Sequence, residues 1–401
     1  MFPMLAVAQA LVARGHPVTV AAEHHHGPTL ATAGIPFVAT DAVQPRPGGF
    51  RSVRDELAAF LSPRSLEQSF ERVLEAAGEA ELIVGNQGGY AGRLVSRYLG
   101  KPWVYCAVSP LALPSRHDPP LWPGVHGMQR ALPAWPWLGR QFLFYARWVS
   151  RALMQPQIRF QKRLGIWDGR NPRFEGLYSD QLNLLMVSPA LIQTQPDWPA
   201  PTQLTGYAWF EPHYLSNPHT LERHAHFMAA GAPPVVVAPG GSARLRPGAF
   251  YQAAMAACRQ LGRRCVLLAS PRFLAELQAL AGDDPAVLVI PYMPYSQLLP
   301  GAAALIHSGG IGALGWAARY EVPSLMMPGD WDQYDNVRLA ERAGWGHGLF
   351  SAAPDASVLT RALGGLLGDE RVRAGLVRAY PQLNSENGAQ QAAQAIGALL
   401  G

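Results

Sequence analysis

The stretch from Ala286 to Asn336 decides the fold, and it reads AVLVIPYMPYSQLLPGAAALIHSGGIGALGWAARYEVPSLMMPGDWDQYDN. Two short apolar runs, Ala303–Ile306 and Val322–Met327, flank a segment with helical character. The first run is followed by His307-Ser308-Gly309-Gly310-Ile311-Gly312. A strand, a glycine turn and a helix in this order form an anion site, because glycine lets the backbone approach a ligand and the free N–H groups at the helix start point towards it.

The second apolar run is followed by a polar segment, Pro328-Gly329-Asp330-Trp331-Asp332-Gln333. In an open parallel sheet, ligands bind beyond the carboxyl ends of the strands. Both polar segments are therefore expected to face one crevice. The glycine turn suits phosphate and the second segment suits hydroxyl groups, a combination that indicates a nucleotide-sugar ligand.

Length and composition favour two globular domains. The chain has 401 residues, of which 49% are hydrophobic and 15% charged, enough apolar material for a large buried core. The net charge of +5 comes from 33 basic and 28 acidic residues, without the clustered basic and aromatic residues of a nucleic-acid site. Attraction to an anionic substrate or membrane surface stays open.

Three cysteines, Cys106, Cys258 and Cys265, form no CxxC pair. This usage predicts buried structural thiols and a cytoplasmic location, where thiols stay reduced. No apolar run approaches the roughly 18 residues of a membrane-spanning helix.

The N-terminal half has the pattern of a doubly wound sheet whose first strand is missing. We expect a helix to Ala13, a stop at Gly15 and a strand at His16–Ala22, so that the chain begins inside the first crossover helix. Strands and helices then alternate, which predicts a parallel sheet. The further strands are expected at Gly34–Ala39, Glu81–Gly85, Pro102–Val108 and Leu182–Ser188, with helices at Pro63–Gly78 and Gly89–Leu99.

A triple histidine, His24-His25-His26, follows the first expected strand. Adjacent residues on a strand or turn point in different directions and rarely bind one ion together. We therefore expect a solvated loop and no metal site.

The segment Ser109–Trp137 is rich in Pro, Trp and His. This density of proline predicts a loop without a helix, either packed on the surface or forming a pocket wall. Leu138–Leu164 then reads as a long basic, amphipathic helix broken near Pro156. Such a helix can pack between domains, line an apolar acceptor site or lie on a membrane.

The sequence predicts an N-terminal acceptor-binding domain over residues 1–200, a nucleotide-sugar-binding domain over residues 215–385 and a last helix over residues 386–401 that packs back on the first domain. The proline-rich run Gln195–Pro201 has linker chemistry. The second domain opens with a strand at Pro234–Ala238, followed by a second glycine turn, Pro239-Gly240-Gly241-Ser242. A helix at Pro247–Leu261 and strands at Cys265–Ser270 and Val287–Ile290 complete the pattern.

At these residues the chain resembles family 1 nucleotide-sugar-dependent glycosyltransferases, which have two Rossmann-like domains facing across a cleft (the GT-B type). It looks closest to the catalytic subunits of bacterial rhamnolipid rhamnosyltransferases. Each motif is weak alone, but their ordered set is specific. The motifs are Pro239–Ser242, Tyr292-Met293-Pro294, His307–Gly312 and Pro328–Asn336, together with Gln195–Pro199 and Thr205-Gly206-Tyr207 in the linker.

The resemblance implies roles for a set of donor-binding residues. Tyr292 would stack on the nucleobase, Ser242 and His307 would bind the diphosphate, and Asp332 with Gln333 would bind sugar hydroxyls. The glycines would let the backbone approach the diphosphate closely. The full set is Ser242, Tyr292, Met293, His307, Ser308, Gly309, Gly310, Gly312, Asp332 and Gln333.

The implied reaction is an inverting transfer of a rhamnose- or glucose-type sugar to a hydroxyl of a hydrophobic, lipid-like acceptor. His307 and the helix start would stabilise the leaving diphosphate without a metal or cofactor. The family's catalytic base and its supporting aspartate have no counterpart here, because the base position precedes Met1 and Asn86-Gln87 stand where the aspartate would be. Gly315 replaces a glutamate that often binds ribose, which is compatible with a dTDP-sugar donor.

Three functions remain open at the level of the sequence. The first is an active transferase, cytoplasmic or peripheral at the inner membrane face. The second is a non-catalytic protein of similar fold that binds a nucleotide-sugar, which a true start at Met1 would favour. The third is a nucleotide-sugar epimerase.

Overall fold

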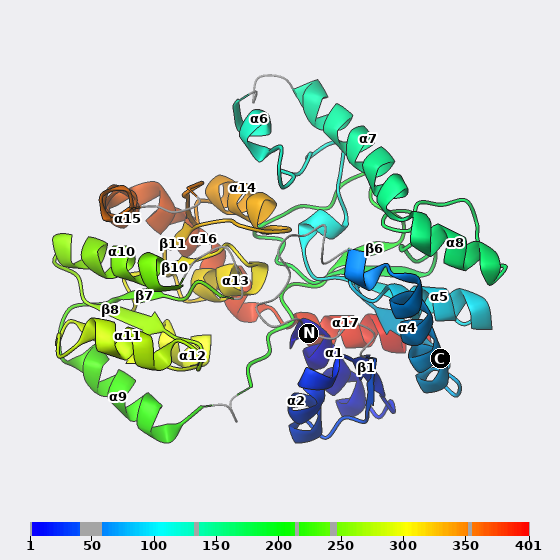
Figure 1. The fold of residues 1–401 in the computed structure, drawn as a ribbon, viewed down its shortest axis with the longest axis horizontal. Helices are drawn as coiled ribbons and strands as arrows, with labels where there is room; N and C mark the ends of the chain where they lie inside the picture. The colour runs from blue at the N-terminus through cyan, green and yellow to red at the C-terminus, as the bar shows by residue number, and fades with distance from the viewer. Residues whose placement is uncertain are drawn as a thin grey trace. The chain divides into compact units, whose positions relative to one another are not determined.

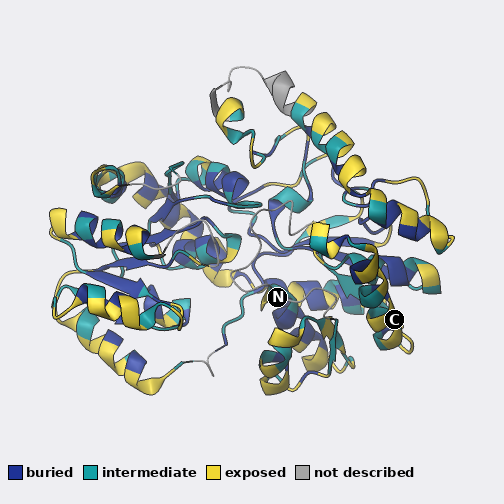
Figure 2. Ribbon diagram, viewed as in Figure 1, coloured by how far each residue is buried: buried dark blue, intermediate teal, exposed yellow. Residues whose placement is uncertain are grey.

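The computed structural model describes residues 2–40, 58–131, 136–212, 216–240, 247–351 and 355–400. The chain divides into two compact α/β units. Unit 1 comprises residues 1–120, 124–210 and 386–401, and unit 2 comprises residues 121–123 and 211–385. Figure 1 shows the elements of each unit, and Figure 2 shows that the strands of unit 2 are largely buried while many helices expose part of their surface.

Unit 2 contains a six-stranded parallel sheet in the order β12-β11-β10-β7-β8-β9. The strands are β7 (Val235–Val237), β8 (Cys265–Leu268), β9 (Val287–Ile290), β10 (Ala304–His307), β11 (Ser324–Met326) and β12 (Gly346–Gly348). Chain order runs outward from β7 to β9, then returns to β10 on the other side of β7. This reversal between β7 and β10 is the switch point at which open parallel sheets bind ligands.

The helices of unit 2 cover both faces of this sheet. They are α9 (Pro218–Ala229), α10 (Pro247–Gln260), α11 (Leu274–Ala281), α12 (Tyr295–Leu298), α13 (Ile311–Arg319), α14 (Gln333–Ala343), α15 (Ala356–Gly368) and α16 (Glu370–Ser385). The central strands carry only apolar residues before the ligand-facing end, and Val235, Val236, Val237, Leu305 and Ile306 are fully buried. Such continuous apolar runs are typical of strands covered on both faces.

In unit 1 the described strands form two separate parallel sheets. One pairs β1 (Val20–Ala22) with β2 (Phe37–Ala39). The other has the order β3-β4-β5-β6. Its strands are β3 (Ile83–Gly85), β4 (Trp103–Ala107), β5 (Leu182–Leu185) and β6 (Thr202–Leu204).

Helix α1 (Phe2–Ala13) contributes to the packing of both sheets of unit 1. Leu5 and Ala8 join a core with Leu30 and Ile35 beside the β1–β2 sheet. Ala6, Val7, Ala10 and Leu11 join a second core with β4, β5 and α17 (Gly388–Gly397). Because the helix is buried on two sides, its sequence is apolar nearly all round.

The remaining elements of unit 1 are η1 (His24–His26), α2 (Gly27–Thr32), α4 (Pro63–Ala76), α5 (Tyr90–Leu99), η2 (Pro110–Ala112), α6 (His126–Ala131), α7 (Pro136–Leu153) and α8 (Gln155–Arg163). The expected break near Pro156 is confirmed, since α7 ends at Leu153 and α8 begins at Gln155. Pro156 lies in the first turn of α8, where its missing N–H has no helical partner to lose.

The prediction of a helix-free segment over Ser109–Trp137 is wrong. This segment contains η2, α6 and the start of α7. Pro110 occupies the first turn of η2, and α6 lies between prolines and contains none, so the prolines delimit helical turns rather than prevent them. The triple histidine likewise forms η1 and not an irregular loop.

The three cysteines are free and buried, which confirms the prediction of structural thiols. Within the described residues no helix has the length and apolar character to cross a membrane.

Candidate functional site

The two polar segments predicted to share one crevice follow neighbouring strands of unit 2. Strands β10 and β11 pair in parallel with His307 opposite Met326, so the glycine turn and the Pro328–Gln333 segment leave the sheet at the same edge. The turn after β7 is also adjacent, because a Cβ atom at Gly240 would lie 3.5 Å from Ser308 Oγ. The expected convergence is confirmed, and it occurs at the switch point of the sheet.

The glycine turn has one position that needs glycine for the fold and two that do not. Gly309 has φ +82°, and a Cβ there would meet Val337 at 3.3 Å and the Gln333 carbonyl oxygen at 3.4 Å. At Gly310 and Gly312 a Cβ would meet nothing within 4 Å among the described residues. Glycine at these two open positions is what close approach of a ligand to the backbone requires. Gly310 is also the N-cap of α13, whose start offers free N–H groups.

His307 at the end of β10 presents a buried donor that has no partner among the described residues. Its side chain is 1% exposed, and its Nδ1 accepts a hydrogen bond from the Gly309 N–H at 3.2 Å. The proton of the neutral ring therefore sits on Nε2. Nε2 has no hydrogen-bond partner within the described part of the chain. Leaving a buried donor without a hydrogen bond costs about 1–3 kcal/mol. We therefore interpret the Nε2–H group as a donor to a ligand.

Burial lowers the pKa of His307 to about 3, which has a consequence for acid stability. The unfolded chain binds this proton near pH 6.5, so the contribution of the neutral ring is present above that pH and is lost as the pH falls towards 3. Between pH 7 and pH 5 the free energy of unfolding of unit 2 should fall by about 2 kcal/mol more in the wild type than in His307→Asn. Urea unfolding at both pH values measures this difference, and equal losses in the two proteins would contradict it.

The second polar segment is held by the side chain of Gln333. Its Oε1 accepts hydrogen bonds from the N–H groups of Gly329 at 2.8 Å and Asp330 at 3.1 Å, which leaves its NH₂ end to act as the ligand donor. Trp331, which lies between Asp330 and Asp332 in this segment, has φ +46°. A large residue in the left-handed region is strained, and such strain concentrates at functional sites.

Asn336 joins the two polar segments, a role that the sequence did not reveal. It is fully buried on α14, and its Nδ2 donates to the Gly309 carbonyl oxygen and to Asp332 Oδ2, both at 3.0 Å. Its Oδ1 is buried and has no partner among the described residues. The signals in the sequence are its place at the end of the Pro328–Asn336 motif and its spacing of four residues from Asp332, the N-cap of α14.

The other predicted donor residues are distributed as follows. Tyr292 is half-buried and follows β9 at the same edge of the sheet, with β7 and β8 between it and His307. Ser308 is 6% exposed beside Gly240. Met293 is buried in the hydrophobic core of unit 2 beside the end of β9. Ser242 lies outside the described residues.

In unit 1, the side chains of Asn86 and Gln87 accept hydrogen bonds from backbone N–H groups. Asn86 Oδ1 accepts from the Gly88 N–H at 2.9 Å, and Gln87 Oε1 accepts from the Val108 N–H at 3.3 Å. Neither amide can take a proton as a general base.

Helix α7 of unit 1 presents a set of exposed aromatic side chains. Phe144 is 71%, Trp148 65% and Tyr145 57% exposed, and the rings of Tyr145 and Trp148 stack at 6.1 Å. Arg147 and Arg151 lie on the same helix, and Arg147 pairs with Glu175. Exposed aromatic surface of this kind is typical of binding surfaces.

Comparison with known proteins finds similarity to glycosyltransferases. Residues 265–399 match the family model of the erythromycin biosynthesis protein CIII-like C-terminal domain. The chain is 28% identical over 352 residues to the O-mycaminosyltylonolide 6-deoxyallosyltransferase of Streptomyces fradiae, covering 81% of this chain and 77% of that protein. It is 26% identical over 404 residues to the glycosyltransferase GtfC of Amycolatopsis orientalis, covering 93% and 88%.

Solved structures share the fold over the whole chain. The calicheamicin glycosyltransferase CalG4 has a TM-score of 0.71 at 17% identity, covering 100% of this chain and 94% of that one. The spinosyn rhamnosyltransferase SpnG, solved with thymidine diphosphate, has a TM-score of 0.67 at 21% identity, covering 100% and 96%. The predicted fold, with two Rossmann-like α/β units of the GT-B type, is therefore confirmed.

Proposed function

We propose that this chain, a nucleotide-sugar glycosyltransferase of the family 1 type with the GT-B fold, uses a thymidine-diphosphate sugar as its donor and a hydrophobic molecule as its acceptor. The sugar is of the rhamnose or glucose type. The observation that carries the donor assignment is the buried Nε2–H of His307, which has no partner among the described residues and lies at the end of β10, before two open glycine positions. Thymidine diphosphate is favoured because two similar structures contain it.

The reaction we infer is an inverting displacement. An acceptor hydroxyl oxygen attacks the anomeric carbon, the bond from that carbon to the diphosphate oxygen breaks, and the hydroxyl proton passes to a general base. The negative charge on the leaving diphosphate is stabilised by the His307 Nε2–H and by the N–H groups at the start of α13. Asp332 and Gln333 hold the sugar hydroxyls, and Tyr292 stacks on the base.

We assign the acceptor to unit 1, with the aromatic face of α7 as its apolar surface. The support is the exposure of Phe144, Tyr145 and Trp148 on a helix that carries arginines and no carboxylates. Hydroxylated fatty acyl chains, as in rhamnolipids, fit such a surface, and the acceptor named for the S. fradiae relative is a second candidate. The same face would support peripheral contact with an anionic membrane.

A product screen tests this assignment. Purified protein is incubated with dTDP-rhamnose, dTDP-glucose or UDP-glucose and with a hydroxylated fatty acid, O-mycaminosyltylonolide or free glucose. We expect transfer from a dTDP-sugar to an apolar acceptor and none to glucose. The double variant Phe144→Ser with Trp148→Ser should lower kcat/KM for the apolar acceptor at least about tenfold, because two large apolar contacts are lost.

The control is Tyr380→Ser, which removes a similarly exposed aromatic ring (44% exposed) from α16 of unit 2. It should leave acceptor kinetics unchanged. Glycosylation of small polar acceptors alone would contradict the proposed acceptor class. Donor binding without transfer to any acceptor would favour a binding protein of the same fold.

A further inference from the structure

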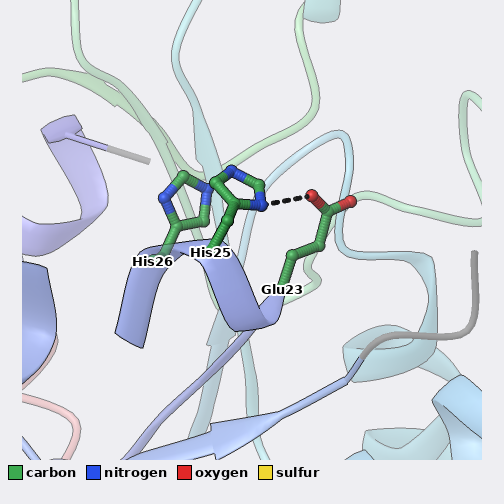
Figure 3. Close-up of side chains that lie close together, drawn as sticks. All are labelled: Glu23, His25 and His26. Carbon is green, nitrogen blue, oxygen red and sulfur yellow. Dashed lines mark ion pairs between the residues drawn. The ribbon is translucent and has the colours of Figure 1, made fainter. Parts of the chain in front are cut away.

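Three side chains that directly follow β1 converge on one point of unit 1. Glu23, His25 and His26 each offer a ligand atom, and all of these atoms lie within 4.8 Å of one another. Figure 3 shows the two imidazole rings side by side on η1, with the Glu23 carboxylate turned towards His25. The ring centroids of His25 and His26 are 3.8 Å apart. None of these groups belongs to the donor site described above.

The local backbone explains a convergence that the sequence argument did not anticipate. In an extended strand or open turn, neighbouring side chains diverge, which led to the expectation of a solvated loop. Instead, Glu23 is the extended N-cap of a 3₁₀ helix. A 3₁₀ helix has three residues per turn, so residues i and i+3 eclipse. The tight turn keeps the three side chains close together, with His25 between Glu23 and His26 and the Glu23 carboxylate paired with His25.

We propose that Glu23, His25 and His26 form a zinc site at the end of β1. Two imidazole nitrogens and one carboxylate oxygen are a ligand set that Zn²⁺ accepts, with water in the fourth position. His25 Nδ1 lies 3.3 Å from Glu23 Oε2, which is close to the edge of a tetrahedron whose metal–ligand bonds are about 2.1 Å. The partial exposure of both side chains, 59% and 42%, leaves room for the rotations that bring the third ligand into range.

A bound ion would tie the end of β1 to η1 and, through it, to the start of α2. Strand β1 pairs only with β2 among the described strands, and β2 is as short as β1. Any ion that binds the folded turn and not the unfolded one stabilises this sheet by mass action. The effect is local to unit 1 and independent of the sugar donor.

Zinc titration of the full chain against a chromophoric chelator tests the proposal. We expect one site in the wild type with micromolar or tighter affinity. Glu23→Gln, His25→Asn and His26→Asn should each weaken zinc binding by at least about tenfold, since even outer partners of metal ligands are worth that much. The matched control is His24→Asn, because His24 belongs to the same run of histidines and offers no ligand to the cluster.

Two further measurements make the result decisive. Cobalt(II) substituted for zinc should give the visible absorption of a four-coordinate site, and this band should disappear in His26→Asn but remain in His24→Asn. The circular dichroism spectra of all four variants should match that of the wild type, which shows that they are folded. No zinc binding at 100 µM free metal (about 10⁻⁴ M, a Kd of weak, non-specific strength) would overturn the proposal. An equal loss of zinc affinity in His24→Asn would also overturn the proposal, since it would mean that the histidine run binds metal without a defined geometry.

Discussion

Replacing His307 by alanine should weaken the binding of dTDP by about 10- to 150-fold. The ring donates its Nε2–H to a charged diphosphate oxygen in the proposed complex, and such a hydrogen bond contributes about 1.5–3 kcal/mol. Calorimetry with dTDP and with UDP measures the loss. Because the imidazole is neutral at pH 7, the affinity should be nearly independent of pH between 6 and 8, apart from the titration of the diphosphate itself.

Two conservative variants separate the donor role of His307 from its role in the turn. Asparagine can place an oxygen where Nδ1 accepts the Gly309 N–H, but it lacks the more distant donor. Glutamine can place an N–H near the position of Nε2. We therefore expect His307→Asn to lose binding as alanine does, and His307→Gln to recover part of it. His347→Ala is the control, because that ring in the same sheet bonds Asp369 at 2.8 Å. Unchanged affinity of His307→Ala for both nucleotides would rule out the assignment.

Gly346→Ala should destabilise unit 2 strongly, by about 3 kcal/mol. Gly346 pairs with Ser324 across β12 and β11, and a Cβ there would lie 2.0 Å from the Ser324 carbonyl oxygen. Backbone atoms cannot move aside as a side chain end can, so β12 must separate from β11. Amide hydrogen exchange of β11 and β12 measures the local loss of stability.

The control for this change is Gly365→Ala on α15. A Cβ at Gly365 would meet nothing within 4 Å, and the residue is exposed. Alanine there should stabilise the protein by about 0.5–1 kcal/mol, because glycine is the poorer helix former. Normal protection of β12 in Gly346→Ala would show that the strand tolerates a side chain at this position.

Five of the six strands of unit 2 were predictable from the sequence, because each of the five is a short apolar run. Strands β7, β9 and β10 occur where Pro234–Ala238, Val287–Ile290 and Ala303–Ile306 were expected. Strand β12 was not predicted. Its sequence, Gly346-His347-Gly348, has no apolar pattern, and it forms a strand because it lacks the side chains that would collide with β11 and Val337.

In the site too, features formed by neighbouring residues in the sequence were predictable, and contacts between distant residues were not. The glycine turn and the Asp332-Gln333 pair are local patterns, and the sequence located them. The bond from Asn336 to Gly309 spans 27 residues, and only the packing of α14 against the turn creates it. The convergence of Glu23, His25 and His26 depends on a 3₁₀ turn, which has no strong signature in sequence.

The packing of α17 against α1 has a consequence for the order in which the protein folds during synthesis. Ala389, Ala392, Ala393 and Ile396 of α17 complete the core that Ala6, Val7 and Leu11 begin, and Glu386 binds Ser188 and the Tyr207 N–H. Residues Glu211–Ser385, which make up nearly all of unit 2, leave the ribosome between these partners. Unit 2 can therefore fold while the apolar surface of α1 is not yet covered by α17. A nascent chain stalled before Glu386 would expose that surface to chaperones.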